Sequence, residues 1–249
     1  MPALDGRIAL VTGASRGIGA GCAAALAEAG ARVLLVHRDS FESCEAAAAG
    51  LAGSGHRVIQ ADVTDSGALK AAAEDIAANE GRLDLLVNNA GFSKVVPPED
   101  LDGLDDATFD RVMQTNVRGP FACVRAFRPM LALGTDPAIV NISSVAAQLA
   151  AGSNIAYCAS KAALDTMTRA LARALAPGIR VFSVAPGLVD TDFTRAWDPA
   201  VRQRQIDLAP MGRLATPEDV GKTVVAVAAG LTFSTGEVIL VDGGRTLAV

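Results

Sequence analysis

Tyr157 is the only tyrosine in this 249-residue chain, and Lys161 follows it four positions later, in the segment IAYCASKAAL. The pattern from 155 to 176 predicts one helix, and residues four apart on a helix share a face. The hydroxyl and the ammonium can therefore point into the same cleft. A tyrosine has an ordinary pKa of about 10, and lowering it by about three units takes roughly 4 kcal/mol, which a cation about 4 Å away supplies at an effective dielectric of about 20. The pair predicts a general acid/base at Tyr157.

A glycine-rich segment, VTGASRGIGAG, follows the first apolar run and opens a predicted helix. Gly13, Gly17 and Gly19 would allow a tight turn and a close approach of a pyrophosphate to the helix N-terminus, where free N–H groups favour negative charge. The spacing is G-x-x-x-G-x-G, and for this motif taken alone a plain loop is the alternative. Its place between a strand and a helix favours a dinucleotide site.

Apolar runs and helical periodicity alternate along the whole chain, which is typical of a parallel sheet with helices on both faces. The expected strands are 7–12, 32–37, 57–61, 83–88, 138–143, 180–185 and 237–241, and the clearest helical segments are 17–29, 41–52, 67–79, 108–133 and 155–176. We expect an α/β protein with a single-domain Rossmann fold over 1–249, built on a doubly wound seven-stranded parallel sheet. The charged, Pro-containing segment 190–216 is expected to form a flap over the strand ends.

The composition argues against several classes of partner. The net charge is -5, with 22 basic and 27 acidic residues interspersed, so we expect no nucleic-acid binding. No apolar stretch reaches the roughly 18 residues of a membrane span, and the N-terminal residues lack the pattern of a secretory signal. The four cysteines are widely spaced, and His37 and His56 belong to no cluster with ligand spacing. These features predict a soluble, cytoplasmic protein with unpaired thiols and no metal.

Eight short motifs in this order resemble the short-chain dehydrogenase/reductase family over essentially the whole chain, and the overall pattern is similar to 3-oxoacyl carrier protein reductases. They are TGASRGIG 12–19, DV 62–63, NNAG 88–91, Asn116 in QTNVRG, ISS 142–144, YCASK 157–161, PGLVDT 186–191 and VDGG 241–244. The resemblance implies a nicotinamide cofactor and hydride transfer between that cofactor and a carbonyl or alcohol carbon.

The resemblance implies a catalytic set of Asn116, Ser144, Tyr157 and Lys161. Ser144 would hydrogen-bond the substrate oxygen, with Ser143 as the competing candidate on the other face of the strand. Asn116 would hold a helix distortion and a water that connects Lys161 to solvent. Taken singly, Ser144 and Asn116 fit ordinary capping or helix-surface roles, since such side chains routinely bond nearby backbone. The ordered set favours the catalytic interpretation.

The resemblance also implies a set of cofactor-binding residues. Besides Tyr157 and Lys161 they are Gly13, Ser15, Arg16, Gly17, Ile18, Gly19, His37, Arg38, Asp62, Val63, Asn89, Ala90, Gly91, Pro186, Gly187, Val189 and Thr191. For Asp62, a turn aspartate that caps the next helix is the alternative. His37 stands where NAD-preferring relatives carry an aspartate, and Arg16 and Arg38 could converge on a 2′-phosphate. NADP(H) is therefore the expected cofactor, unless arginine is simply the chain's default cation.

The substrate is expected to be a small ketone or secondary alcohol. Pocket candidates by position are Ser93, Lys94, Val95, Gln148, Asn154, Leu188, Phe193 and Trp197. A 3-oxoacyl carrier protein reductase is the alternative, disfavoured because Thr135 and the short LAPGI stretch 175–179 supply no cation where such reductases present one to an acidic carrier. A cofactor-binding regulator without chemistry is a third possibility. By resemblance, the chain should form a homotetramer through the helices near 108–133 and 155–176.

Overall fold

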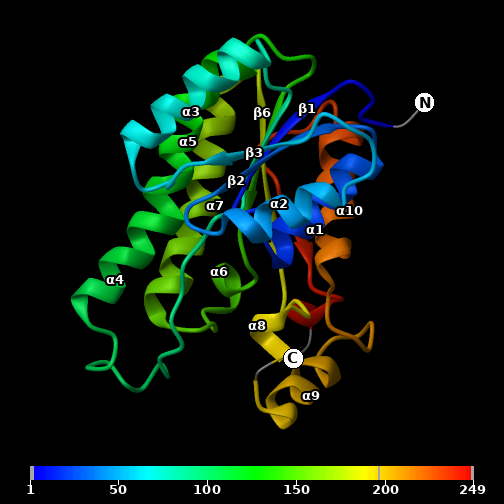
Figure 1. The fold of residues 1–249 in the computed structure, drawn as a ribbon. Coiled ribbons are helices and arrows are strands. Elements are labelled where there is room, and N and C mark those ends of the chain that lie inside the picture. The colour runs from blue at the N-terminus through cyan, green and yellow to red at the C-terminus, as the bar shows by residue number, and fades with distance from the viewer. Residues whose placement is uncertain (1–2, 196, 248–249) are drawn as a thin grey trace.

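The computed structural model describes residues 3–195 and 197–247, which are built around one seven-stranded sheet (Figure 1). The strands are β1 Ile8–Thr12, β2 Arg32–His37, β3 Arg57–Gln60, β4 Leu85–Asn88, β5 Ala138–Ile142, β6 Arg180–Pro186 and β7 Val238–Val241. Their spatial order is β3-β2-β1-β4-β5-β6-β7, and every neighbouring pair is parallel. The predicted doubly wound parallel sheet is confirmed.

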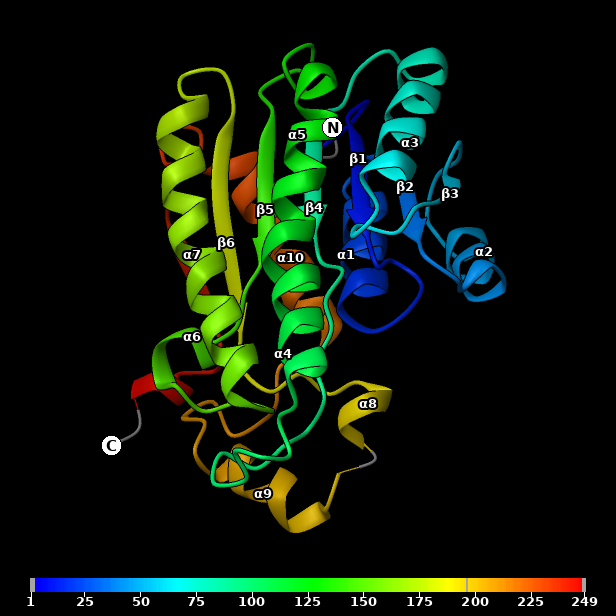
Figure 2. The ribbon, with the colours of Figure 1, turned by 90° about the vertical axis from the view of Figure 1, so that its left-hand side faces the viewer.

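Helices cover both faces of this sheet, as the continuous apolar strands require. The helices are α1 Gly17–Glu28, α2 Phe41–Ala49, α3 Ser66–Asn79, α4 Asp106–Met113, α5 Gly119–Leu131, α6 Ala146–Leu149, α7 Ile155–Leu175, α8 Asp192–Arg195, α9 Pro199–Asp207 and α10 Pro217–Gly230. Helices α3, α5 and α7 lie on one face, which Figure 2 shows from the front, and α1 and α10 lie on the other (Figure 1). A short 3₁₀ turn, Arg245–Leu247, follows β7.

Side chains that alternate along each strand feed two separate apolar cores. Val11 of β1 packs with Leu26 of α1 and Val224 of α10 in one core. Leu10 of the same strand packs with Phe127 of α5 in the other core. The central strands are thus buried on both sides, and their positions are fixed by helices from both halves of the chain.

The order of the strands creates a crevice at the carboxyl ends of β1 and β4. The chain runs outward from β1 to β3 and then returns to place β4 on the other side of β1. In sheets of this kind, ligands bind where the strand order reverses, because the loops after the two central strands diverge there. Most of the predicted site residues follow a strand at this end, from Gly13 after β1 to Gly187 after β6.

The expected helix over 108–133 is wrong in detail, because it is divided by a π-helical segment. Helix α4 ends at Met113, the π-helix Gln114–Arg118 follows, and α5 begins at Gly119. The wider turn contains Asn116, whose buried side chain bonds to neighbouring backbone instead of facing solvent. A distortion at Asn116, which the family resemblance implied, is therefore present.

The segment 190–216 leaves the sheet beyond β6 and carries the short helices α8 and α9 (Figures 1 and 2). An isolated parallel bridge between Val189 and Ala215 closes its base. Asp190 accepts hydrogen bonds from Arg195 at 3.2 Å and from Arg202 at 3.0 Å, which ties both helices to that base. Among the described residues, no helix has the length and apolarity to cross a membrane.

Candidate active site

Helix α7 carries both members of the tyrosine–lysine pair. Asn154 caps its N-terminus, where the side-chain oxygen accepts a hydrogen bond from the Tyr157 backbone N–H at 2.7 Å. Lys161, one turn further along, is only 6% exposed, and its Nζ donates to the backbone oxygen of Ile142 at 2.8 Å. The Lys161 Nζ lies 5.6 Å from the centre of the Tyr157 ring. The predicted shared face of the helix is therefore observed.

Burial shifts the pKa values of Tyr157 and Lys161 in opposite directions. Burial raises the pKa of Tyr157, while its interaction with the Ser144 hydroxyl acts in the opposite direction. Burial also lowers the pKa of Lys161 to about 8, and the nearby Asp165 carboxylate partly offsets that shift. The lowering of the tyrosine pKa by Lys161 together with an oxidised nicotinamide stays a prediction. Withdrawal from water acts on both groups and favours their neutral forms.

Ser144 lies beyond the end of β5, which stops at Ile142, one residue short of the expected strand 138–143. Its hydroxyl accepts a hydrogen bond from the Ala146 backbone at 3.1 Å and interacts with Tyr157. Ser143 is buried and turned the other way, and its hydroxyl donates to the backbone oxygen of Lys161 at 3.4 Å. Of the two candidates, only Ser144 has its hydroxyl beside the tyrosine.

Asn116 is 1% exposed and joins three segments. Its Oδ1 accepts from the backbone N–H of Phe92 at 2.8 Å, and its Nδ2 donates to the Phe92 oxygen at 3.0 Å and to the Ser160 hydroxyl at 3.1 Å. Both side-chain donors are occupied. A water that links Lys161 to solvent would therefore have to be held by an acceptor oxygen of Asn116.

The glycine-rich loop after β1 has the backbone geometry that glycine alone adopts easily. Gly13 and Gly17 have φ values of 64° and 55°, in the left-handed region. A Cβ on Gly19 would lie 2.2 Å from the Gly13 oxygen and 2.5 Å from Asn89 Nδ2, so α1 can approach the loop only without a side chain there. A Cβ on Gly17 would stand 3.6 Å from Thr191 Cγ2, which places the loop beside the PGLVDT segment.

The NNAG segment after β4 is bound to the same loop. Asn89 Nδ2 donates to the backbone oxygens of Thr12 at 2.9 Å and Gly13 at 3.0 Å. The Thr12 hydroxyl accepts from the backbone N–H groups of Asn89 and Ala90, each at 3.0 Å. Thr12 was not among the predicted site residues. Its place at the last position of an apolar strand before the glycine loop is the signal that could have identified it.

The remaining predicted cofactor residues lie near the same end of the sheet. Most of their hydrogen bonds stabilise turns or join neighbouring segments of the chain. Asp62 Oδ1 accepts from the backbone and the hydroxyl of Thr64, each at 2.7 Å, so it stabilises a turn, and Asp65 caps α3 instead. Val63 and Val189 are buried, and the Gly187 N–H bonds to the Val241 oxygen at 3.1 Å. The other members of the set are Ser15, Arg16, Ile18, Gly91 and Pro186, of which Arg16 is exposed ahead of α1 and Pro186 ends β6.

The end of β2 holds a buried histidine and an exposed ion pair. His37 is 3% exposed, and neither of its ring nitrogens has a hydrogen-bond partner among the described residues. Arg38 donates through Nε and Nη2 to Asp39 Oδ2, at 3.0 and 2.8 Å. The guanidinium therefore pairs with its own neighbour, and the convergence of Arg16 and Arg38 on a 2′-phosphate stays a prediction. Sequence reasoning missed Asp39, although its position directly after Arg38 is a visible signal.

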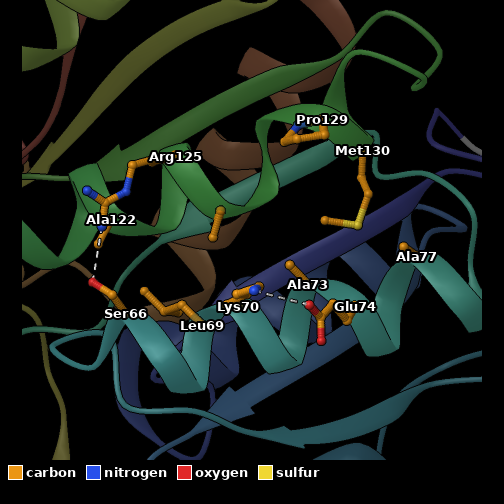
Figure 3. Close-up of a pocket in the computed structure, with 11 residues that line it drawn as sticks. Ser66, Leu69, Lys70, Ala73, Glu74, Ala77, Ala122, Arg125, Pro129 and Met130 are labelled. Atoms are coloured by element: carbon orange, nitrogen blue, oxygen red, sulfur yellow. Dashed lines mark hydrogen bonds and ion pairs between the residues drawn. The ribbon is translucent and has the colours of Figure 1, made fainter.

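The pocket candidates are only partly brought together. Ser93 and Asn154 contact one another, whereas Val95 and Gln148 are exposed. The Phe193 side chain lies outside the described part of the chain. A separate groove of about 480 Å³ lies between α3 and α5 (Figure 3). Its lining includes Leu69, Ala73, Ala122 and Met130 but none of the predicted catalytic or cofactor residues.

Comparison with known proteins agrees with this geometry. Residues 13–246 match a family profile described as enoyl-(acyl carrier protein) reductase. The chain is 37% identical to D-threitol dehydrogenase of Mycolicibacterium smegmatis, covering 98% of this chain and 94% of the relative. It is 35% identical to a 3-oxoacyl-[acyl-carrier-protein] reductase of Staphylococcus aureus, covering 95% and 96%. Its fold matches the Pseudomonas aeruginosa RhlG/NADP active-site complex with a TM-score of 0.90 and 37% identity, covering 98% and 99% of the two chains.

These matches span almost the entire chain at well over 30% identity. The chain therefore belongs to the short-chain dehydrogenase/reductase family. It is an oxidoreductase of that family, acting on an alcohol or ketone group.

Proposed function

We propose that this protein is an NADP(H)-dependent oxidoreductase that interconverts a small ketone and a secondary alcohol, with Tyr157 as the general acid/base. The observation that carries the proposal is the grouping of Tyr157, Ser144 and Lys161 at the carboxyl end of the sheet, next to the glycine-rich loop. When bound, the nicotinamide cofactor would supply or accept the hydride. The residues of this chain would then have to bind the substrate oxygen and transfer its proton.

In this proposal Ser144 and Tyr157 both bind the substrate oxygen. The Ser144 hydroxyl would hold it by a hydrogen bond, and Tyr157 would donate its proton to that oxygen during reduction, or take one from the alcohol during oxidation. Burial raises the pKa of Tyr157, which disfavours proton release, and the hydrogen bond to Ser144 acts against that shift. Lys161, fixed by the Ile142 oxygen, would stabilise the tyrosinate, and an acceptor oxygen of Asn116 would hold the water that returns the proton.

The residues present fit a dinucleotide. The left-handed glycines at 13 and 17 leave the backbone of the loop free of side chains, and the loop leads into the N-terminus of the 12-residue helix α1. The buried His37, whose ring nitrogens lack partners among the described residues, lies where the ribose of the adenosine half would be placed. Arg16 and Arg38 would bind the 2′-phosphate of NADP(H), with the remaining predicted cofactor residues lining the groove between β1 and β4.

A homotetramer and a cytoplasmic location complete the proposal. Apolar side chains are exposed on the helices expected to pack against other subunits: Phe109 on α4, Phe121 on α5 and Ile155 on α7 are each more than a third exposed. The four cysteines are free, which fits a compartment where thiols stay reduced.

A second candidate is reduction of a 3-oxoacyl group on acyl carrier protein, as the name of the Staphylococcus aureus relative suggests. Exposed arginines on α5 and α7, namely Arg125, Arg128, Arg169 and Arg173, favour it, because an acidic carrier needs a basic docking surface.

The test is to incubate the protein with NADPH and a panel of cyclic ketones, polyol-derived ketoses, steroids and acyl thioesters, and to follow nicotinamide absorbance. Steady oxidation of NADPH is expected with at least one class of substrate. NADPH binding without turnover on any class would contradict it and would favour a regulatory cofactor-binding protein.

A further inference from the structure

Asn154 connects the start of the tyrosine helix to the loop that follows the NNAG segment. The side chain is 2% exposed. Its Oδ1 accepts the Tyr157 backbone N–H at 2.7 Å, and its Nδ2 donates to the backbone oxygen of Lys94 at 2.7 Å and to the Ser93 hydroxyl at 3.2 Å. The orientation of the amide is fixed by chemistry, because a backbone N–H can only donate and a carbonyl can only accept. One side chain therefore holds two segments that are 60 residues apart in sequence.

The loop 92–96 is fixed at its other positions as well. Asn116 binds both the N–H and the carbonyl of Phe92. The Val96 N–H donates to the Ser153 oxygen at 2.8 Å, and the hydroxyls of Ser93 and Ser153 bond to each other. The loop is thus held between the π-helix on one side and the turn before α7 on the other.

The turn before α7 also touches the tyrosine ring. A Cβ on Gly152 would lie 3.2 Å from Tyr157 Cδ1 and 3.1 Å from Cys158 Sγ, so the backbone of this turn packs directly against the ring. Movement of the turn would therefore displace the loop and the tyrosine together.

We propose that Asn154 is a positioning residue that sets the loop 92–96 at a fixed place relative to the Tyr157 hydroxyl, and so shapes the substrate side of the pocket. This inference rests on the proposed function of Tyr157. The two roles of the Asn154 amide can be separated chemically, because its oxygen caps the helix and its nitrogen holds the loop. Losing the nitrogen alone should free the loop and leave the helix intact.

Two substitutions of Asn154 distinguish its capping of the helix from its hold on the loop. Asn154→Ser keeps a good N-cap acceptor and loses both donors to the loop, whereas Asn154→Ala loses the cap as well. We expect hydrogen exchange of backbone amides within 92–96 to become at least about threefold faster in both variants. Exchange of the Tyr157 amide should accelerate only in Asn154→Ala. For the best substrate, Asn154→Ser should raise KM at least about threefold, with kcat and the Kd for NADPH changed by less than about twofold.

A matched control is Asp65→Ala, which removes the N-cap of α3, an acceptor from Gly67 and Ala68. Asp65→Ala should lower the melting temperature without changing amide exchange in 92–96 or the KM. The proposal would be overturned if Asn154→Ser matched the wild type in loop exchange and KM, or if it accelerated exchange throughout the chain. The exchange measurement does not depend on turnover, so failure of this inference is distinguishable from failure of the proposed reaction.

Discussion

The ammonium nitrogen of Lys161 lies 5.6 Å from the centre of the Tyr157 ring and is held there by the backbone oxygen of Ile142, not by the tyrosine. The end of β5 thus sets the position of the lysine. Because the site is buried, the lysine remains close to the tyrosine at the expense of its own hydration, and its pKa falls from 10.5 to about 8.

This lowered pKa predicts that Lys161→Met stabilises the fold at neutral pH while it removes activity. A shift from 10.5 to about 8 corresponds to roughly 3 kcal/mol of unfavourable free energy below pH 8, partly offset by about 1 kcal/mol for the lost hydrogen bond. The penalty is fully present below the folded pKa and disappears as pH rises towards the unfolded value. Chemical denaturation at pH 7 should therefore give the variant about 2 kcal/mol more stability than the wild type.

The difference in unfolding free energy between Lys161→Met and the wild type should narrow as the pH rises from 8 towards 10.5. Lys70→Met is the control, since the Lys70 side chain is 79% exposed and pairs with Glu74 at 3.8 Å. It should show no such dependence. A Lys161→Met protein that is less stable than the wild type by the same amount at every pH would contradict this prediction.

The ion pair between Arg38 and Asp39 predicts that Asp39 weakens NADPH binding. Arg38→Ala should raise the Kd for NADPH at least about tenfold and change the Kd for NADH by less than about twofold. Asp39→Asn frees the guanidinium and removes one repulsive charge, which in water is worth about 1 kcal/mol, or roughly fivefold tighter NADPH binding. Fluorescence titration of both nucleotides measures these constants. Asp102→Asn, an exposed carboxylate on another loop, is the control. Equal Kd values for the two nucleotides in the wild type would contradict the assignment of NADP(H).

The sheet and the tyrosine–lysine pair were predictable because they leave local signals. Continuous apolar runs identify buried strands, and a lone tyrosine four residues before a lysine on a predicted helix identifies the pair. The side-chain choice between Ser143 and Ser144 was also predictable, because neighbouring residues at a strand end face opposite ways.

Features that depend on tertiary packing leave no local pattern in the sequence, and the distortion at Asn116 was expected only from the family resemblance. The π-helix at Asn116 arises from bonds to Phe92 and Ser160, which are distant in sequence, so the helical periodicity over 108–133 does not show it. The shifted pKa of Lys161 depends on burial by several elements. Arg38 appeared free for a phosphate because the pairing with Asp39 depends on side-chain conformations. Asn154 appeared only as a pocket candidate, and its two bonding partners become visible only in the fold.

The opposite end of the sheet carries a buried carboxylate that should matter for stability alone. The Glu80 side chain is 1% exposed, accepts from Arg57 Nη1 at 2.9 Å and also pairs with Arg32. Glu80→Gln removes the charge that both guanidiniums share and should lower the free energy of unfolding by about 3 kcal/mol, as broken buried pairs do. Thermal unfolding measures the loss of stability, and steady-state kinetics should show an unchanged kcat. Glu74→Gln, in an exposed pair, should change stability by about 0 to 1 kcal/mol. Equal effects of the two substitutions would rule out a special role for Glu80.

The preference for a small molecule over acyl carrier protein predicts similar kcat/KM for an acetoacetyl group on the carrier and on a short pantetheine thioester. Steering by surface charge is screened over about 10 Å at 0.1 M salt, so a reaction that depends on it slows as salt is added. Without such steering, both kcat/KM values should respond weakly to salt. The comparison is made at low and high ionic strength. A preference for the carrier above tenfold that collapses with salt would show that Arg125, Arg128, Arg169 or Arg173 forms a docking surface, and the second candidate function would then hold.

The central claim is that Tyr157 transfers the proton, and Tyr157→Phe tests it most directly. The variant keeps the ring that packs against Gly152 and loses only the hydroxyl. Single-turnover oxidation of bound NADPH by the best ketone should slow at least about a hundredfold, because general acid/base catalysis contributes about 10² to 10⁴. The Kd for NADPH should stay within about twofold of the wild type. A Tyr157→Phe protein that binds NADPH normally and retains more than about a tenth of the wild-type rate would contradict the account.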